Sequence, residues 1–197
     1  MKKTKEETYK TKKRILNAAF ECFFSNGFKA TSLEMIATHA SLTRGAVYWH
    51  FKDKTELYRE VVSETLKDAD VVKYAYDLPD GMEYAERLYE VFWFAQSENP
   101  KVDFLYKTLN FVADSKEFSD LKEAIQLEKV KLFRYFVEET RMYIKQKGID
   151  VTSPEDYASA LFLLFEGLFL TKNISVGLAK GREDIERYIQ IIIHDLL

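Results

Sequence analysis

The sequence predicts an all-α protein, and three observations support this class. Glycine and proline are scarce, with 7 and 3 among 197 residues, so long uninterrupted segments are available for helices. Apolar residues recur every three or four positions along most of the chain, which is the period of an amphipathic helix. The alternating valine-rich runs typical of β-strands are not found in the sequence. We therefore expect an N-terminal three-helix module followed by a larger helical module.

Three helices are expected in the first fifty residues. The first covers about residues 8–25 and is stopped by the dipeptide NG that follows it. Thr31 and Glu34 have the spacing of a capping box, which predicts a short second helix ending near Ala40. A third helix covers about residues 43–50.

A long helix is expected next. Asp53 and Glu56 form a second capping pattern directly before it. An apolar stripe at helical spacing follows. This stripe consists of Leu57, Val61, Val62, Leu66 and Ala69.

The remaining helices follow the turn sequence DLPDG at residues 77–81. One of them begins at SPED, with Ser153 as N-cap and Pro154 at the first helical position. The apolar spacing of the others is equally regular. These helices cover about residues 84–92, 102–112, 121–144, 154–176 and 182–196.

Charge is distributed unevenly along the chain. Residues 1–54 contain 11 Lys and Arg against 5 Asp and Glu, a balance of +6, whereas residues 55–197 contain 18 against 27, a balance of −9. A concentrated basic segment is the electrostatic signature of a protein that binds nucleic acid or an anionic membrane. A lysine-rich tail that only aids solubility is the alternative interpretation.

Cysteine usage and hydropathy bear on the compartment. The single cysteine, Cys22, excludes an intrachain disulfide framework and a cysteine zinc cluster, which suits a reducing cytoplasm. The charged N-terminus does not lead into a signal-peptide core. The most apolar run contains Glu166 and is too short to span a bilayer. We expect a cytoplasmic protein without a membrane partner, a metal or a cofactor.

Residues 33–51, LEMIATHASLTRGAVYWHF, have the pattern of a helix-turn-helix. Ile36 and Val47 are placed to face inward and to set the crossing of the two helices. Gly45 and Ala46 keep the front of the second helix slender enough for a DNA major groove, which is about 12 Å wide. The N-terminal residues of that helix would then meet base edges.

On these residues the chain resembles a known family. Residues 12–58 resemble the DNA-binding domain of the TetR family of bacterial repressors, with the link NGF.ATS and the run Tyr-x-His-Phe-x-x-Lys in register. Within it, TRGAVYWHFKDKTEL is most similar to the AcrR-like branch, which represses multidrug efflux pumps. The resemblance covers about a quarter of the chain. Ser41 stands where the family usually has Gly; if this position needs a positive φ, Ser costs about 1 kcal/mol.

The resemblance and the residue chemistry together assign DNA-binding roles. Arg44 can pair bidentately with a guanine, and Trp49 offers an apolar edge to a thymine methyl. Lys54 presents a cation and a helix N-terminus to phosphate. Tyr48 as a core residue and His50 as an ordinary histidine are the open alternatives. The predicted DNA-binding set is Thr31, Ser32, Thr43, Arg44, Gly45, Tyr48, Trp49, His50 and Lys54.

Aromatic residues dominate the second module, and core packing is their ordinary meaning. The resemblance implies an inducer pocket there, and helical spacing places several rings where they could line one. Glu166 is costly in its apolar run unless it is paired; inside a pocket it would suit a lipophilic cation. Alternatively it faces outward or pairs with an arginine of a partner chain. The predicted ligand-binding set is Trp93, Phe104, Phe111, Phe133, Phe162, Phe165, Glu166 and Phe169.

The last two predicted helices carry more apolar surface than one chain needs, which favours a homodimer through these helices; completion of a monomer core is the alternative. The family implies such a dimer, which would read a palindromic operator in double-stranded DNA. We therefore expect a DNA-binding domain at 1–53 and a ligand-binding and dimerisation domain at 54–197. The predicted function is repression of transcription, with an efflux-pump operon as candidate target and a small hydrophobic inducer.

Other regulatory and interaction roles share features of the sequence, whereas catalysis does not. A DNA-binding regulator with a different ligand, or an activator, shares every feature above. An interaction adaptor with its basic end on a membrane is a further alternative. An enzyme is not expected, because the sequence shows no Ser/His/Asp order, no metal-binding histidine spacing and no glycine-rich phosphate loop.

Overall fold

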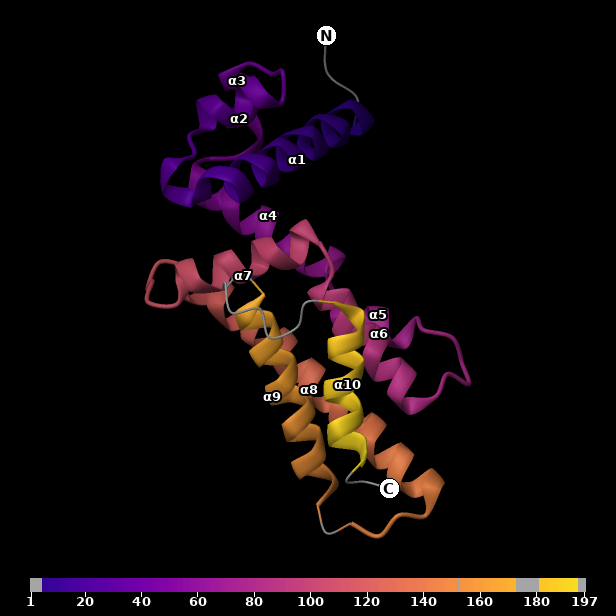
Figure 1. Cartoon of the computed structure of the whole chain (residues 1–197). Helices are drawn as coiled ribbons and strands as arrows, with labels where there is room; N and C mark the ends of the chain where they lie inside the picture. Colours follow the sequence, from indigo (N-terminus) through magenta and orange to yellow (C-terminus); the bar gives the residue numbers. More distant parts are fainter. Residues whose placement is uncertain (1–4, 152, 173–180, 195–197) are drawn as a thin grey trace. The chain divides into compact units, whose positions relative to one another are not determined.

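The computed structural model describes residues 5–151, 153–172 and 181–194. Every regular element in these ranges is an α-helix, so the predicted all-α class is confirmed (Figure 1). The chain forms two compact units. Unit 1 comprises Met1–Ala69 and Pro100–Lys122, and unit 2 comprises Asp70–Asn99 and Glu123–Leu197. The predicted functional division at residues 53 and 54 stays a prediction.

Unit 1 contains the helix-turn-helix. Its helices are α1 (Lys5–Ala30), α2 (Leu33–His39), α3 (Arg44–His50), α4 (Lys54–Asp68), α7 (Pro100–Val112) and the first turn of α8 (Ser119–Lys147). α1 packs on α2, α4 and α7, and α2 packs on α3. The predicted order of short and long helices is therefore confirmed.

The core of unit 1 is formed by the predicted apolar stripes. Ile15, Ile36, Val47 and Leu57 are fully buried, one from each of the first four helices, and Phe51 is 2 % exposed. Each such side chain contributes about 1.5–3 kcal/mol through its removal from water. This shared core fixes the crossing of α2 and α3.

The predicted stop after α1 lies at the expected glycine, but the next cap was assigned to the wrong residue. Gly27 leaves the helical conformation with φ 75° and ψ 169°. Ser32 is the N-cap of α2, and its hydroxyl accepts from the Met35 amide at 3.2 Å. Thr31 is instead buried and donates to the carbonyls of Cys22 (3.1 Å) and Gly27 (2.8 Å). The turn at Gly27 directs Thr31 back onto the end of α1, away from α2.

An aromatic cluster joins α1, α4 and α7 within unit 1. The Tyr58 ring lies 4.9 Å from that of Phe23 and 6.0 Å from that of Phe104. The Tyr58 hydroxyl and the Thr108 hydroxyl are 2.9 Å apart, which satisfies two buried polar groups. Burial of the Tyr58 phenol raises its pKa.

Unit 2 packs around α6. Its helices are α5 (Val71–Tyr76), α6 (Tyr84–Gln96), most of α8, α9 (Pro154–Thr171) and α10 (Arg182–His194). α6 contacts α5, α9 and α10, and α9 contacts α10 (Figure 1). Leu88, Phe92, Phe136 and Leu161 are fully buried at its centre. Ser153 is the N-cap of α9 and Pro154 its first residue, as predicted.

Candidate nucleic-acid interface and ligand site

The turn between α2 and α3 is tight and depends on one unusual residue. Ala40 donates its amide to Ile36 and Leu42 donates to Ala37, both at 2.8 Å. Ser41 between them has φ 52°, and within the described ranges it is the one residue other than glycine with a positive φ. From the sequence, the cost of serine in place of glycine depended on whether this position needs a positive φ. The structure shows that φ is positive here.

α3 presents most of its surface to solvent. Val47 is its one fully buried side chain, whereas Trp49 is 69 % and Tyr48 44 % exposed. A Cβ added at Gly45 would meet no atom within 4 Å, so the front of the helix is open. An exposed large aromatic on a short helix is a candidate contact for a partner.

Arg44, the first residue of α3, is held by two neighbours. Its Nη1 lies 2.7 Å from a carboxylate oxygen of Glu34 on α2. Its Nη2 donates to the Tyr48 hydroxyl at 3.2 Å, and the guanidinium lies 5.2 Å from the Tyr48 ring centroid. The Tyr48 hydrogen bond and then the Glu34 charge raise the pKa of Arg44. The sequence pattern predicted Arg44 and Tyr48 but not Glu34, which lies ten positions upstream on another helix.

The hydroxyls of Ser32 and Thr43 cap the two helices. Thr43 is the N-cap of α3 and accepts from the Ala46 amide at 3.2 Å, as Ser32 does for α2. A capping hydroxyl uses an acceptor lone pair, so its own proton remains available to a phosphate oxygen. Both residues therefore keep the chemistry that the sequence predicted for them.

Two predicted DNA contacts have structural roles. Thr31 is 2 % exposed, so its side chain is left out of the interface proposed below. Lys54 donates to the carbonyls of Phe28 (2.8 Å), which follows the kink at Gly27 in α1, and of Thr31 (2.7 Å), which follows α1. Its ammonium thus satisfies carbonyls that a helix end leaves open. The partners lie 26 and 23 residues away, so no local pattern could reveal them.

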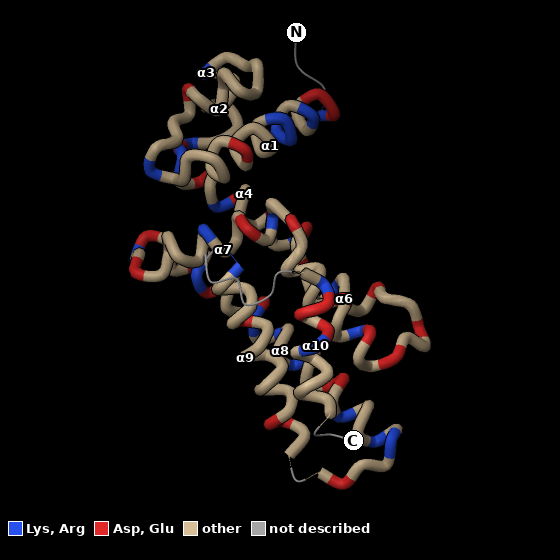
Figure 2. The backbone as a smooth tube through the Cα atoms, in the orientation of Figure 1, with Lys and Arg blue, Asp and Glu red and all other residues tan. Residues whose placement is uncertain are grey.

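Lysines and arginines gather along the N-terminal half of α1 (Figure 2). Lys12 pairs with Glu60 of α4 and lies 5.7 Å from the Phe51 ring centroid, while Lys10 pairs with Glu6. Lys13 is exposed. Lys2 and Lys3, the first lysines of the basic segment, lie outside the described residues.

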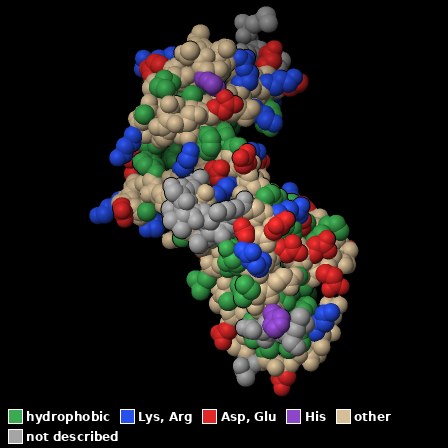
Figure 3. Space-filling model, in the orientation of Figure 1, with side chains coloured by type: hydrophobic (Ala, Val, Ile, Leu, Met, Phe, Trp, Pro, Cys, Tyr) green, Lys and Arg blue, Asp and Glu red, His purple; other side chains and the backbone are tan. Residues whose placement is uncertain are grey.

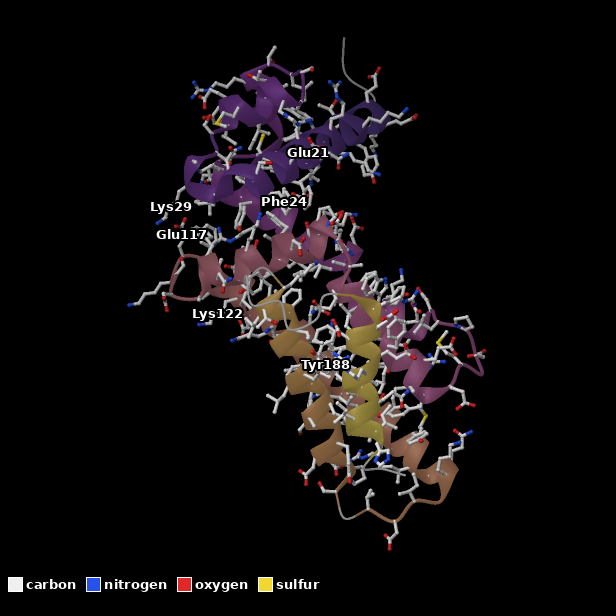
Figure 4. All side chains as sticks on the ribbon, in the orientation of Figure 1. Glu21, Phe24, Lys29, Glu117, Lys122 and Tyr188 are labelled. Carbon is white, nitrogen blue, oxygen red and sulfur yellow. The ribbon has the colours of Figure 1, made fainter. Side chains whose placement is uncertain are left out.

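A small polar hollow of about 300 Å³ lies between α1 and α2. Glu21, labelled on α1 in Figure 4, pairs with His39 of α2, with 2.5 Å between its carboxylate oxygen and the His39 Nε2. Arg14 donates to the Ala40 carbonyl at 2.6 Å and so supports the turn before α3.

The predicted ligand-binding residues are divided between the two units. Phe104 and Phe111 belong to unit 1, where both rings pack near Tyr58. The other predicted residues belong to unit 2. There Phe165 is 5 % exposed in the core, and Phe133 and Phe162 form an edge-to-face pair at 5.5 Å.

Glu166 has a partner within its own chain. Its carboxylate pairs with the ammonium of Lys129 on α8, and the two side chains are 20 % and 31 % exposed. This pair stabilises a charge that would otherwise be costly among apolar residues. From the sequence, an arginine of a partner chain was an alternative ion-pair partner for Glu166. The partner in the structure is Lys129 of the same chain, which is 37 residues away and so cannot be found from a local pattern.

A groove of about 640 Å³ lies between α6 and α10. Arg182 pairs there with Glu90 and lies 4.5 Å from the Tyr89 ring centroid. Acidic side chains gather over this part of unit 2 (Figure 3). None of the predicted ligand-binding residues lines the groove, whose carboxylates are those of Glu83, Glu86, Glu90, Glu183 and Glu186.

Neither a metal-binding cluster nor a membrane-spanning helix is found in the part of the chain that the structure describes. No group of three or more His, Cys, Asp or Glu is placed there to hold a metal ion. No helix in these ranges has both the length and the apolar character required to cross a bilayer.

Comparison with known proteins identifies the helix-turn-helix. Residues 15–61 match the family described as bacterial regulatory proteins, tetR family. Over 60 residues, 30 % of this chain, the sequence is 48 % identical to the HTH-type transcriptional regulator AcrR of Shigella flexneri. The match spans 28 % of that relative, so less than a third of its length is covered.

Solved structures match almost the whole chain at lower identity. NalD of Pseudomonas aeruginosa has a TM-score of 0.67 at 24 % identity, covering 97 % of this chain and 98 % of that one. SmeT, solved in complex with triclosan, has a TM-score of 0.68 at 22 % identity, covering 94 % and 91 %. At this identity the likeness establishes the fold. The N-terminal helix-turn-helix of the chain thus matches the tetR family of bacterial regulatory proteins, and the chain as a whole shares the fold of these solved structures.

Proposed function

We propose that the chain is a DNA-binding transcriptional repressor released from its operator by a small molecule. The observation that carries this is the open face of α3, where Arg44, Tyr48 and Trp49 are exposed on a helix anchored by Val47. A helix of this kind enters the major groove and reads bases with its leading residues.

The proposed contacts follow from the chemistry of each side chain. Arg44 pairs with a guanine, and Trp49 contacts a thymine methyl or a sugar. Ser32, Thr43 and Tyr48 donate hydroxyl protons to phosphate oxygens, and His50 donates a ring N–H to one. Gly45 lets the backbone approach the groove closely. Lys54 acts indirectly, because its ammonium holds the end of α1.

A homodimer through α9 and α10 would present two α3 helices to the DNA, one for each half-site of the operator. Leu163, Leu170 and Ile191 on these helices are 70 %, 46 % and 62 % exposed. Burial of such side chains on the same helices of a second copy favours association. Two α3 helices about 34–36 Å apart would then read a palindrome on one side of the duplex.

We infer that the inducer binds in residues 54–197. The solved complex of SmeT with triclosan shows that a protein of this fold holds a small aromatic molecule. Among the predicted ligand-binding residues, Phe133 and Phe162 form a ring pair and lie four positions from Lys129 and Glu166 respectively on α8 and α9, while Phe169 follows Glu166 by three. A ligand that binds better to a state with the wrong α3 separation shifts the population off DNA.

An efflux-pump operon is the target that we propose. NalD is the secondary repressor of the MexAB-OprM multidrug efflux pump in Pseudomonas aeruginosa, and the AcrR-like resemblance of residues 43–57 supports the same kind of target. Activation in place of repression, or a different ligand, would use the same interface. A membrane-bound adaptor is disfavoured because the family match lies on the basic end of the chain.

The test is selection of bound duplexes from a random pool with the full chain. A repressor of this type enriches a palindrome and loses affinity steeply with salt. Arg44→Ala is expected to relax base preference at one position in each half-site, whereas Lys54→Ala should weaken binding to all sequences alike. A pool that shows no enrichment, or unchanged binding by both variants, would refute the proposed docking.

The ligand is tested separately. A lipophilic cationic dye and a neutral aromatic of similar size are titrated into the wild type and into Glu166→Gln. Tighter dye binding by the wild type than by the variant supports an inducer site at Glu166. Equal dye affinity removes Glu166 from that site and leaves the DNA-binding proposal untouched.

A further inference from the structure

We propose that Glu34 is a specificity-determining residue: its carboxylate holds the Arg44 guanidinium in the orientation that reads a base. This inference rests on the proposed function, since it concerns how the same interface discriminates sequences. Glu34 belongs to α2, and its negative charge argues against a direct contact with DNA.

The geometry places Arg44 between two restraints. Glu34 binds Nη1 at 2.7 Å, and Tyr48 accepts from Nη2 at 3.2 Å. The Tyr48 ring lies beneath the guanidinium, with 5.2 Å between its centroid and the Arg44 carbon Cζ. A carboxylate, a hydroxyl and a ring face thus define both the direction and the plane of the guanidinium.

The restraints leave base-reading donors on Arg44. A guanidinium has five N–H groups, and these two partners engage one on each terminal nitrogen, so each keeps another. Bidentate pairing with a guanine requires two N–H groups in one plane. An arginine already fixed in its plane loses less conformational entropy on binding, which favours the correct base.

The charge of Glu34 adds a penalty for wrong placement. Its side chain is 51 % exposed on the same surface as Arg44, which is 61 % exposed. If Arg44 turned away to a phosphate, Glu34 would face the DNA backbone without its cation. Such a repulsive element discriminates against non-cognate binding modes as effectively as a new contact favours the cognate one.

The experiment compares binding of two duplexes by full-length variants. One duplex is that enriched by the wild type from a random pool, and the other is a scrambled duplex of the same composition. The specificity ratio is the dissociation constant for the scrambled duplex divided by that for the enriched duplex. The variants are Glu34→Ala, Glu34→Gln, Arg44→Ala and the double variant Glu34→Ala/Arg44→Ala. Glu64→Gln removes the same charge from an exposed site on α4 and serves as the matched control.

Glu34→Ala is expected to lower the specificity ratio about tenfold, the scale of one good bidentate base contact. It should also tighten binding to the scrambled duplex, because a carboxylate leaves the interface. The double variant should have the same specificity ratio as Arg44→Ala, since Glu34 affects discrimination through Arg44. Glu64→Gln should change both duplexes alike. Circular dichroism melts establish that each variant is folded, and Glu34→Gln, with a smaller loss expected, substitutes if Glu34→Ala unfolds.

Three results would overturn the inference. An unchanged ratio in Glu34→Ala would mean that Arg44 is oriented without Glu34. Equal tightening on both duplexes would reduce Glu34 to a charge that repels phosphate. A specificity ratio in the double variant that is lower than in Arg44→Ala would show that Glu34 contacts DNA directly. If the wild type enriches no duplex from the random pool, the proposed function itself is refuted, which distinguishes that outcome from a failure of the Glu34 inference.

Discussion

The ammonium of Lys54 donates to the Phe28 carbonyl at 2.8 Å and lies 4.5 Å from the centroid of the Phe28 ring. It also donates to the Thr31 carbonyl at 2.7 Å. One side chain at the start of α4 thereby satisfies the backbone where α1 ends and α2 is about to begin. The helix-turn-helix is held to α4 by this contact as well as by its core.

Lys54→Ala is therefore expected to lower the free energy of unfolding by about 2 kcal/mol, because charged hydrogen bonds to two carbonyls are lost. Urea denaturation followed by circular dichroism measures this. Lys67→Ala, which removes an exposed lysine from the same helix, should cost much less than Lys54→Ala. Equal small losses in both variants would show that the Lys54 contacts contribute little.

Ser41→Gly is expected to raise the free energy of unfolding by about 1 kcal/mol, because Ser41 has φ 52° and glycine tolerates that conformation without strain. The same change at Ser63, an exposed position inside α4, should have the opposite sign and cost about 0.5 kcal/mol. Chemical denaturation of both variants decides the matter. Destabilisation by Ser41→Gly would mean that the serine side chain supports the turn.

The pair of Arg59 and Asp120 within unit 1 predicts a pH dependence. Arg59 donates from Nε and Nη2 to the two carboxylate oxygens, at 2.8 Å and 3.3 Å, and this lowers the Asp120 pKa below its ordinary 3.8. A lowered folded-state pKa gives stability that is present above pH 3.8 and is lost as pH falls through the folded value.

Asp120→Asn should thus cost about 0.5–1 kcal/mol at pH 7, a modest amount because both side chains are partly exposed. The difference from wild type should vanish at acid pH, where the wild-type carboxyl is also neutral. Melting curves between pH 2 and pH 7 measure it. Asp114→Asn, exposed in the turn before α8, is the control, and a constant difference across the range would contradict the prediction.

The pair of Glu166 and Lys129 is expected to be coupled. Glu166→Gln and Lys129→Met should each lower the free energy of unfolding by about 1–2 kcal/mol, because each leaves a partly buried charge without its partner. The double variant should lose less than the sum of the two. Glu128→Gln, whose pair with Lys131 joins adjacent turns of α8, should cost under about 0.5 kcal/mol. Strict additivity in the double variant would show that the pair contributes nothing.

The sequence by itself determined those features that depend on neighbours three or four positions apart. Apolar spacing placed the buried faces of α1 and α4, and Pro154 marked the start of α9. The resemblance carried by residues 12–58 identified the helix-turn-helix and singled out Ser41 as the position where glycine is expected.

Which charged groups form contacts with one another can be known only from the tertiary structure. Glu34 and Arg44 are ten residues apart, Lys54 and Phe28 are 26 apart, and Glu166 and Lys129 are 37 apart. Such pairs require the crossing of two helices, and this crossing is set by side-chain packing in a shared core. The same limit explains the error at Thr31, whose capping pattern was sound locally. The turn at Gly27 buried its hydroxyl and left the cap to Ser32.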